Sequence, residues 1–413
     1  MKQSNIAVGL DIGTTKVCVV VARKNDSSNK AEVIGVGVAP TRGLRKGVVI
    51  DVEETVTSIS EAMEKAERMS GTKIDHAVIS IGGNHLESVT NKGAVAVSNK
   101  DGDISASDVS RALESASAIS LQPNREIIHV IPQTYIVDDQ EGIKDPIGMS
   151  GIRLEANTHI IHASAPFVKN LERCINQAGI QVDLLVAAPI AAATAVLSKR
   201  QKELGSAVID MGGETTSIAV YEEGNIIGTS VIPVGSNHIT KDITVGLRTS
   251  PDVAERIKLE YGAASKKSVG KKDEIDLSAF SKIEKAKVRR ADVVYLIEAR
   301  LSELFSLIKK DMAKIKKGSY LPGGIVLTGG GAKMPEIVDF AKKELKLPTQ
   351  IGFPHDIEGI VDRVDDPTFA VPLGLIFTSF DQVEPSGNLF GLGNLQAGKV
   401  WDKAKKLFKN ILP

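Results

Sequence analysis

Short apolar runs alternate along the chain with longer segments in which apolar residues recur every three or four positions. Runs of four to six apolar residues predict buried strands, and the longer period predicts amphipathic helices. In the first part of the chain this pattern predicts strands over Ile6–Leu10, Val17–Val21 and Val33–Val38, and then a helix that begins at Asp51. This succession of strands and helices is typical of an α/β protein.

The pattern changes between residues 83 and 162, where one helix is followed by alternating strands. We expect that helix to begin at Ser105 or Ser107, because serine is a favoured N-cap residue. The α/β pattern then resumes and includes an alanine-rich helix from Pro189 to Leu197. Residues 236–318 bring lysine-rich helical segments. The sequence therefore predicts an α/β core with two insertions.

Composition and charge limit which kinds of partner the protein can bind and which cellular compartment it can occupy. A chain of 413 residues is too long for one ordinary domain, and Lys+Arg equals Asp+Glu at 51 each, so no global charge attracts nucleic acid. The two cysteines, Cys18 and Cys174, give no disulfide framework and no cysteine-based zinc site. We find no signal-peptide core and no window near the roughly 20 apolar residues of a membrane span. A cytoplasmic protein that does not cross a bilayer is expected.

Two glycine turns carry the candidate chemistry. Segments Gly9–Lys16 and Asp210–Ser217 share one design, in which an apolar strand leads to an aspartate, a glycine turn and then hydroxyl side chains. An aspartate at the end of a strand can hold a hydrated magnesium ion, and the glycines let the turn present backbone amides to phosphate oxygens. Taken singly, each segment fits an ordinary tight turn equally well. Facing each other, the two would form a phosphate clamp.

A third motif strengthens this interpretation. Segment Gly323–Pro335 is a buried strand that ends in three consecutive glycines, where the backbone can lie flat against a base or a ribose. Three such motifs in this order favour a nucleotide site over three unrelated turns.

The order and content of these motifs resemble the actin-like ATPase superfamily. Within it, segments Gly43–Asp51, Val78–His85 and Gly323–Gly331 resemble the FtsA family of cell-division proteins. The resemblance covers nearly the whole chain and implies an actin-like two-lobed α/β fold of duplicated ribonuclease-H-like domains. It implies the following organisation: a first lobe (1–82 and 163–195) with an FtsA-type inserted interaction subdomain (83–162), a second lobe (196–235 and 319–380) with a second insertion (236–318), a flexible linker (381–398) and a C-terminal amphipathic helix (399–412).

The resemblance also implies that the chain binds ATP and Mg²⁺, with Asp11 and Asp210 facing the metal through water. It places Glu255 and Lys258 beside the nucleoside, although an ordinary ion pair three residues apart explains them as well. The pattern leaves open which side of its strand Lys16 faces. The implied nucleotide-binding residues are Asp11, Gly13, Thr14, Thr15, Lys16, Asp210, Gly212, Gly213, Thr215, Thr216, Glu255, Lys258, Gly329, Gly330, Gly331 and Met334.

The sequence departs from the superfamily pattern at one place that affects the expected rate of ATP hydrolysis. Its fast ATPases often carry a Gln or Glu where the chain first crosses between the lobes, and this residue orients the attacking water. Here that stretch is Val186–Ala192, which has only apolar side chains. We expect weak or no ATPase activity, and no catalytic residue is predicted.

The C-terminal segment 399–412 has one apolar face and five lysines against a single acid, Asp402. A helix docked on its own core, a helix for a groove on a partner, and an in-plane membrane anchor are all compatible with this pattern. The preceding linker argues against the first, and Trp and Phe on the apolar face favour an anionic membrane. The expected membrane residues are Val400, Trp401, Lys403, Ala404, Lys406, Leu407, Phe408, Ile411 and Leu412.

The resemblance implies a polymerising protein that tethers the FtsZ ring to the cytoplasmic face of the inner membrane at the division site. Expected partners are the FtsZ C-terminal peptide, further copies of the chain in filaments, anionic lipid, and later division proteins that contact residues 83–162. Two alternatives remain, an actin-like pilus-assembly scaffold and, on the same fold, a small-molecule kinase. For the FtsZ peptide the candidate contacts are Arg289, Arg290, Glu298 and Arg300, whose charges a solvated helical face explains almost as well.

Overall fold

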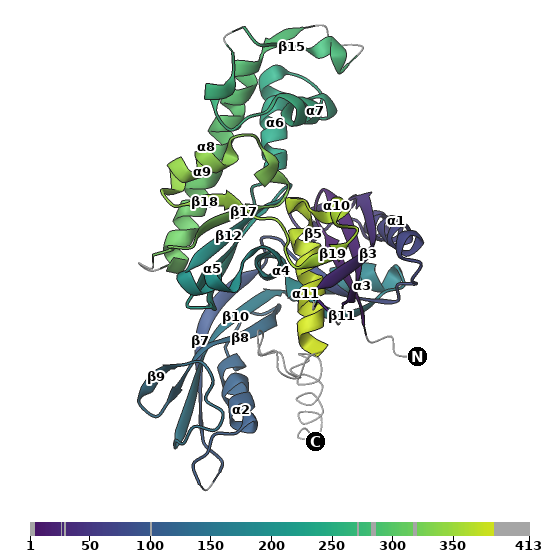
Figure 1. Ribbon diagram of the computed structural model, residues 1–413. Coiled ribbons are helices and arrows are strands. Elements are labelled where there is room, and N and C mark those ends of the chain that lie inside the picture. The colour runs from purple at the N-terminus through teal and green to yellow at the C-terminus, as the bar shows by residue number, and fades with distance from the viewer. Residues whose placement is uncertain are drawn as a thin grey trace.

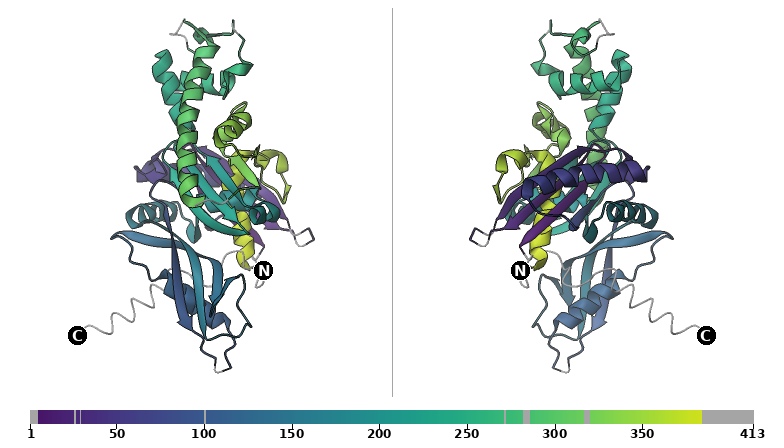
Figure 2. Two further views of the ribbon diagram at one scale, coloured as in Figure 1. Left: turned by 90° about the vertical axis from the view of Figure 1, so that its left-hand side faces the viewer. Right: turned by 90° about the vertical axis from the view of Figure 1, so that its right-hand side faces the viewer.

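The computed structural model describes residues 5–25, 27–28, 30–99, 101–270, 272–281, 286–316 and 320–383. In this part of the chain, two lobes built on β-sheets lie side by side, and a further subdomain projects from each end of the body (Figures 1 and 2). Helix α4 (Ala188–Val196) lies where the chain passes from the first lobe to the second.

The sheet of the first lobe has the strand order β11-β6-β1-β2-β3-β19. Strands β1 to β3 form an antiparallel meander, β6 runs parallel to β1, and β11 runs parallel to β6. The central strands are covered on both faces, which is why they read as unbroken apolar runs. The elements are β1 (Ile6–Ile12), β2 (Lys16–Lys24), β3 (Ala31–Pro40), β6 (His76–Ile81), β11 (Gln181–Ala187), β19 (Ile357–Gly359), and the helices α1 (Val52–Ser70) and α3 (Ala165–Gln177).

Helix α1 begins where the sequence predicts. The Asp51 side chain caps it by accepting a hydrogen bond from the backbone N–H of Glu54, and Gly71 ends it in the left-handed conformation. Ile59, Ala62 and other residues at helical spacing are buried against β2 and β3.

The sheet of the second lobe repeats this plan. Its strand order is β14-β13-β12-β17-β18, with β12 to β14 as the antiparallel meander and β17 and β18 parallel to β12. Asp11 pairs with Cys18 in the first sheet, and Asp210 pairs with Ser217, again seven residues later, in the second. This duplication confirms the predicted fold class. The elements are β12 (Ser206–Met211), β13 (Thr216–Glu222), β14 (Asn225–Ile232), β17 (Gly324–Thr328), β18 (Thr349–Ile351), α5 (Lys199–Leu204) and α9 (Ile337–Leu345).

The inserted subdomain is an antiparallel sheet of order β7-β10-β8-β9 covered by α2. Ser105, not Ser107, is the N-cap of α2, in a reciprocal capping box with Asp108. The Gln133 amide donates to the backbone oxygen of Ile226 on β14 at 2.6 Å, so the subdomain also contacts the second lobe. The elements are β7 (Glu87–Ala96), α2 (Ala106–Ser117), β8 (Arg125–Val137), β9 (Gln140–Ile143) and β10 (Arg153–Ser164).

The second insertion consists mainly of helices at the opposite end of the body (Figure 1). The long helix α8 returns from it to pack on β13 and β14, and its buried residues Ile297 and Phe305 belong to the core of the second lobe. Insertion and lobe therefore share one hydrophobic core. The elements are α6 (Ser236–Leu247), α7 (Pro251–Tyr261), β15 (Glu274–Asp276), β16 (Lys287–Arg289) and α8 (Arg290–Lys316).

Residues 357–383 depart from the expected organisation, which assigned the chain from 319 to 380 to the second lobe. Strand β19 pairs with β3, and helix α11 (Ala370–Val383) packs on β1 and β2 of the first lobe. Leu373 and Ile376 of this helix are fully buried in the core of that lobe. The sequence did not reveal this return because α11 is largely apolar, and such a pattern does not say which sheet the helix covers.

Helices α4 and α11 form the joint between the lobes. Every residue of α4 is buried, and α4 contacts both α11 and the second-lobe strands β12 and β13. Gly374 of α11 lies directly against the backbone of Ala191, where a Cβ atom would overlap the carbonyl oxygen. The small residues of both helices therefore permit a close crossing at this joint.

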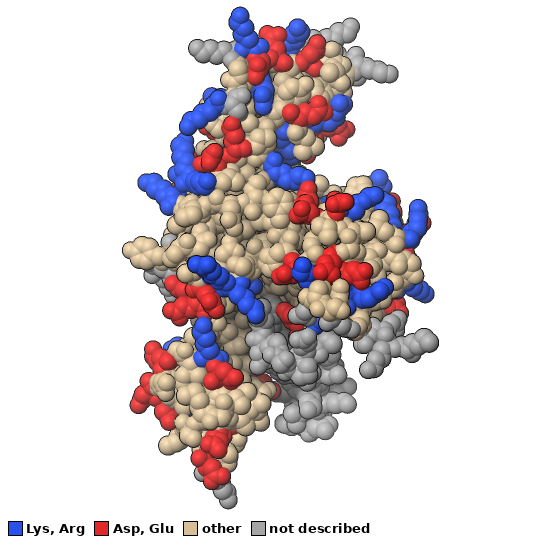
Figure 3. All heavy atoms as spheres, viewed as in Figure 1, with Lys and Arg blue, Asp and Glu red and all other residues tan. Residues whose placement is uncertain are grey.

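Charged side chains of both signs are interspersed over the face of the molecule drawn in Figure 3. This distribution agrees with the equal numbers of acidic and basic residues.

Substitution Gly374→Ala tests the helix crossing. Because the added methyl group must displace α4, we expect the free energy of unfolding to fall by about 1–3 kcal/mol. Urea denaturation followed by circular dichroism measures this change. Ser379→Ala, a half-buried position on the same helix, is the matched control and should change stability by less than about 0.5 kcal/mol. Equal stability of the two variants would contradict the close crossing.

Candidate functional site

The first turn, between β1 and β2, is closed by a hydrogen bond from the Gly13 N–H to the Lys16 carbonyl at 3.1 Å. Asp11 stands just before the turn. Its carboxylate accepts a hydrogen bond of 2.6 Å from the hydroxyl of Ser80, which comes from the neighbouring strand β6. A residue 69 positions away in sequence thus fixes the orientation of the Asp11 side chain.

The second turn, between β12 and β13, has the same geometry. The Gly212 N–H donates to the Thr215 carbonyl at 2.9 Å, the equivalent of the bond in the first turn. The backbone amides of Ser236 and Asn237, at the start of α6, donate to the carbonyls of Gly212 and Gly213 at 2.9 and 2.7 Å. Helix α6 therefore begins on this turn and supports it.

The two turns face each other across a cavity of about 330 Å³. The third motif forms another wall, where β17 ends and the glycines follow. Gly329 has φ 80°, and its N–H donates to the carbonyl of Pro367 at 3.2 Å. The cavity is lined by almost every residue expected at the site: Asp11, Gly13, Thr14, Thr15, Lys16, Asp210, Gly212, Gly213, Thr215, Glu255, Lys258, Gly329, Gly330, Gly331 and Met334.

Thr216 is the exception, and the prediction for it was wrong. Its side chain is fully buried, and its hydroxyl donates to the carbonyl of Val234 at 2.8 Å. Strand β13 begins at this residue, so side chains alternate from here. Thr215 and Ser217 consequently face the cavity, and Thr216 points away from it.

The structure also settles the direction of Lys16, which faces the cavity. Its ammonium group donates to the Thr368 hydroxyl at 2.9 Å and lies 4.5 Å from the centre of the Phe369 ring. Both partners belong to the short helix η4 (Pro367–Phe369), immediately before α11. The cation of the first turn is therefore held by the segment that leads into α11.

Several lining residues were not expected at the site. They are Gly47, Ser80, Gly82, Gly83, Ala188, Ser217, Ser236, Asn237, Leu259, Lys333, Pro335, Pro367, Thr368 and Val371, together with Ile12 of the first turn. Gly47, Gly82 and Gly83 lie in segments that carried the family resemblance, and for Gly82 and Gly83 the position of glycine at the end of a largely apolar run was an available signal. Ser80 and Thr368 carry no such local signal, because only the fold brings them to the cavity.

The two aspartates give the cavity its electrostatic character. Burial raises the pKa of Asp11, while the Ser80 hydrogen bond and Lys16 oppose that shift. Burial, and then the negative charge of Asp11, raise the pKa of Asp210 to about 7, again opposed by Lys16. The two carboxylates are half-buried, and a cation between them would relieve the penalty that burial and the neighbouring charge place on the ionised form of Asp210.

The donor set at these aspartates fits magnesium. Carboxylate and hydroxyl oxygens are the hard ligands that Mg²⁺ prefers, and Mg²⁺ usually retains several waters and binds substrate phosphates. Across the described residues, no group of three or more His, Cys, Asp or Glu side chains is placed to hold a metal ion. An Mg²⁺ ion beside the two aspartates would keep several of its water ligands.

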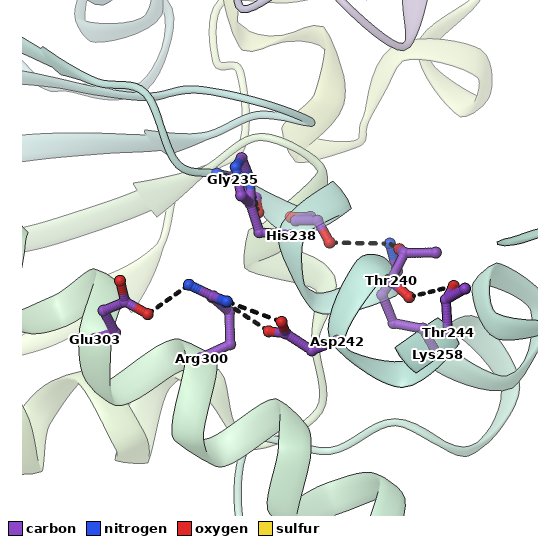
Figure 4. A network of polar contacts seen from close by, with 9 residues as sticks. Gly235, His238, Thr240, Asp242, Thr244, Lys258, Arg300 and Glu303 are labelled. Atoms are coloured by element: carbon purple, nitrogen blue, oxygen red, sulfur yellow. Dashed lines mark hydrogen bonds and ion pairs between the residues drawn. The ribbon is translucent and has the colours of Figure 1, made fainter. Parts of the chain in front are cut away.

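Helix α7, which begins at the N-cap Ser250, brings Glu255 and Lys258 to the cavity. The Lys258 side chain is only 6% exposed, and its ammonium group donates to the Glu255 carboxylate at 2.7 Å and to the Thr240 hydroxyl at 2.9 Å. Figure 4 shows Lys258 beside Thr240 of α6. The ion pair between Glu255 and Lys258, which was the alternative explanation for these two residues, is present, and Thr240 links it to α6.

The four residues expected to contact a partner lie in the second insertion, outside the cavity. Arg289 makes a bidentate ion pair with Asp292, and Arg290 donates to the Tyr261 carbonyl. Glu298 is half-buried on α8.

Arg300 lies between Asp242 and Glu303, with nitrogen–oxygen distances of 2.6 and 2.8 Å to Asp242 (Figure 4). The hydrogen bond to Asp242 raises the pKa of Arg300. Arg300 therefore joins α8 to α6, and of the three arginines Arg289 has the most exposed side chain, at 71%.

The expected linker and membrane helix lie outside the described residues, apart from residues 381–383. This holds for all of the predicted membrane residues, Val400, Trp401, Lys403, Ala404, Lys406, Leu407, Phe408, Ile411 and Leu412. Within the described ranges, none of the helices combines the length and the apolar character needed to span a bilayer.

Solved structures with a similar fold include actin-like proteins. The chain from the PilM-PilN type IV pilus biogenesis complex superposes with a TM-score of 0.65 at 17% identity, over 92% of this chain and 99% of that one. MreB5 of Spiroplasma citri bound to ADP superposes with a TM-score of 0.51 at 16% identity, over 91% and 96%. At these identities the similarity concerns the fold alone, and it confirms the predicted actin-like architecture.

Sequence comparison identifies the family. A model described as "Cell division protein FtsA" matches residues 207–374, and one described as "SHS2 domain inserted in FTSA" matches residues 83–162. The cell division protein FtsA of Neisseria meningitidis serogroup B is 41% identical over 89% of this chain and 88% of its own length. That of Borreliella burgdorferi is 41% identical over 92% of each. These similarities over most of both chains exclude the pilus-scaffold and kinase alternatives, and the chain belongs to the FtsA family of cell-division proteins.

Proposed function

We propose that the cavity binds ATP together with Mg²⁺ and that the bound nucleotide holds the two lobes together. One observation carries this proposal: two turns of identical hydrogen-bonding geometry, each preceded by an aspartate, face each other across a cavity whose third wall is a glycine loop. The ADP-bound state named for MreB5, which has a similar fold, supports it.

The residues around the cavity suggest a role for each wall. Amides and hydroxyls of the two turns, with Lys16, would hold the phosphates, because backbone N–H groups in glycine turns favour anions. Asp11 and Asp210 would hold Mg²⁺ through water, and the ion would neutralise phosphate charge when bound. Gly329–Gly331 and Met334 would contact the base and ribose, with the Glu255–Lys258 pair beside them.

Turnover is expected to be slow in this proposal. The wall at the lobe crossing is formed by Ala188, whose methyl group cannot orient a water molecule. Nucleotide would then act mainly as a ligand that stabilises the closed lobes by mass action.

We further propose that the protein polymerises and tethers FtsZ to the cytoplasmic face of the inner membrane at the division site. The C-terminal sequence supports the membrane part, because each lysine near an anionic leaflet contributes about 1 kcal/mol and a single short helix binds only reversibly. A filament would present many such helices to one surface and so retain the polymer by effective concentration.

Partners would dock at the two ends of the body. The FtsZ C-terminal peptide is proposed to bind the second insertion, where Arg289 has the greatest exposure of the candidate arginines and Arg290, Glu298 and Arg300 would contribute less directly. Later division proteins are proposed to bind the subdomain formed by residues 83–162.

Substitution Lys258→Ala tests the nucleotide site. It removes the ammonium group beside the nucleoside, and we expect ATP affinity to fall about 10-fold, as for loss of one charged hydrogen bond. Equilibrium binding of a fluorescent ATP analogue measures the effect. Arg256→Ala, an exposed position on the same helix, is the control and should bind normally. Unchanged affinity in Lys258→Ala would remove Lys258 from the site.

Asp210 should make Mg–ATP binding dependent on pH. Because its pKa is about 7 in the free protein, affinity should rise up to about 10-fold per pH unit below pH 7 and level off above it. A carboxyl pKa raised by folding also makes the free protein less stable as pH rises from about 4 to 7.

Asp210→Asn should reduce both pH effects, leaving only the part that Asp11 contributes, and should weaken Mg–ATP binding, whereas Asp339→Asn, at an exposed position, should retain them in full. Titration calorimetry and thermal unfolding between pH 5 and 8.5 give the two profiles. A wild-type affinity that does not change across this range would argue against Asp210 as a metal-facing group.

Removal of residues 384–413 tests the membrane proposal. The truncated protein should lose most of its sedimentation with vesicles that contain phosphatidylglycerol, because both the apolar face and the lysines are gone. Neutral phosphatidylcholine vesicles are the control and should retain little of either protein. Equal sedimentation of truncated and full-length protein with anionic vesicles would place the membrane contact elsewhere.

A further inference from the structure

A short hairpin of the first lobe reaches across the cleft to the second phosphate turn. It consists of β4 (Leu44–Arg45) and β5 (Val48–Val49), joined by Lys46 and Gly47. Both turn residues have positive φ, 51° and 77°, the conformation of a tight hairpin turn. Gly47 lines the cavity and lies so close to Gly83 that a Cβ atom on it would come within 2.5 Å of the Gly83 Cα.

Glu214 of the second lobe binds this hairpin. One carboxylate oxygen accepts a hydrogen bond of 2.7 Å from the backbone N–H of Lys46. The other oxygen lies 3.5 Å from the ammonium group of Lys241 on α6. The Glu214 side chain is 14% exposed, so solvent screens the contact only partly.

The hydrogen bond from Lys46 to Glu214 is not one of the backbone bonds that form the turn between β12 and β13. The turn between β12 and β13 is closed by the backbone bond from Gly212 to Thr215 and supported by α6 through Ser236 and Asn237. Glu214 stands in this turn, and its two carboxylate oxygens contact Lys46 of the other lobe and Lys241 of its own lobe. The two lobes also meet beside it, where Gly213 packs against the Thr15 hydroxyl.

We infer that Glu214 is a positioning residue that fastens the β4–β5 hairpin over the phosphate end of the cavity and slows the release of nucleotide. This inference rests on the proposed binding of ATP in the cavity. A bound nucleotide leaves after the lobes separate at the cavity mouth, and separation requires that the hydrogen bond from Lys46 to Glu214 breaks. The contact therefore raises the barrier to dissociation.

The proposal predicts that a series of variants changes the rate of nucleotide release by graded amounts. Glu214→Ala removes the acceptor, and we expect nucleotide dissociation to accelerate about 10-fold, as for loss of one charged hydrogen bond. Glu214→Gln keeps an oxygen that can accept from Lys46 and should recover part of the effect. Lys241→Ala removes only the longer contact and should have a smaller effect than Glu214→Ala. Glu61→Ala, an exposed position on α1, is the charge-matched control and should match wild type.

Two measurements on the full-length protein test the proposal. Stopped-flow chase of a fluorescent ATP analogue in the presence of Mg²⁺ gives the rate of release. Hydrogen exchange of the amides in residues 44–49 in nucleotide-free protein reports on the hairpin itself. We expect Glu214→Ala, and not Glu61→Ala, to accelerate both release and exchange.

The exchange measurement separates this inference from the proposed function. If wild-type protein fails to bind the analogue, the proposed function fails and the effect on release fails with it, while exchange still tests the hairpin contact. If Glu214→Ala leaves hairpin exchange or the rate of release at the wild-type value, Glu214 does not fasten the lobes and the inference is overturned.

Discussion

The placement of two half-buried carboxylates, Asp11 and Asp210, in one cavity is the constraint on which the site depends. Each ends a central strand of its own sheet, and the folded chain brings them near each other in a cavity where burial disfavours their charged forms. Ser80 and Lys16 offset only part of that penalty. A divalent cation with its phosphates would supply the missing positive charge and hydrogen-bonding partners, so the ligand completes an arrangement that the protein leaves electrostatically unfavourable.

Duplication of one strand meander explains how these carboxylates come to face each other. The turns after Asp11 and Asp210 share the same closing hydrogen bond and the same strand register, so two equivalent turns meet at the cleft. The joint formed by α4 and α11 holds the lobes at the base of the cleft, and the Glu214 contact fastens them at its mouth. A nucleotide bound between the joint and the Glu214 contact would touch both lobes. Helix α11 starts at the cavity wall and ends just before the C-terminal segment, so the nucleotide would also lie against the segment that leads to the C-terminus.

Local sequence was sufficient for the strands, the two aspartate turns and the glycine loop, because each has its signal within about ten residues. It was insufficient where the fold joins distant segments. Ser80 reaches Asp11 across 69 residues, and Thr368 holds Lys16 across 352. The prediction for Thr216 was wrong for a different reason. Strand β13 begins at that residue, and the alternation of side chains along the strand turns its hydroxyl away from the cavity. The return of residues 357–383 to the first lobe likewise depends on packing that apolar composition alone does not specify.

The central claim is that one Mg–ATP binds between the lobes. Titration calorimetry of the full-length protein with ATP at pH 8, in Mg²⁺ and in EDTA, tests it most directly. The account predicts one site per chain, with much tighter binding in Mg²⁺ than in EDTA. Absence of binding, or equal affinity with and without the metal, would contradict it.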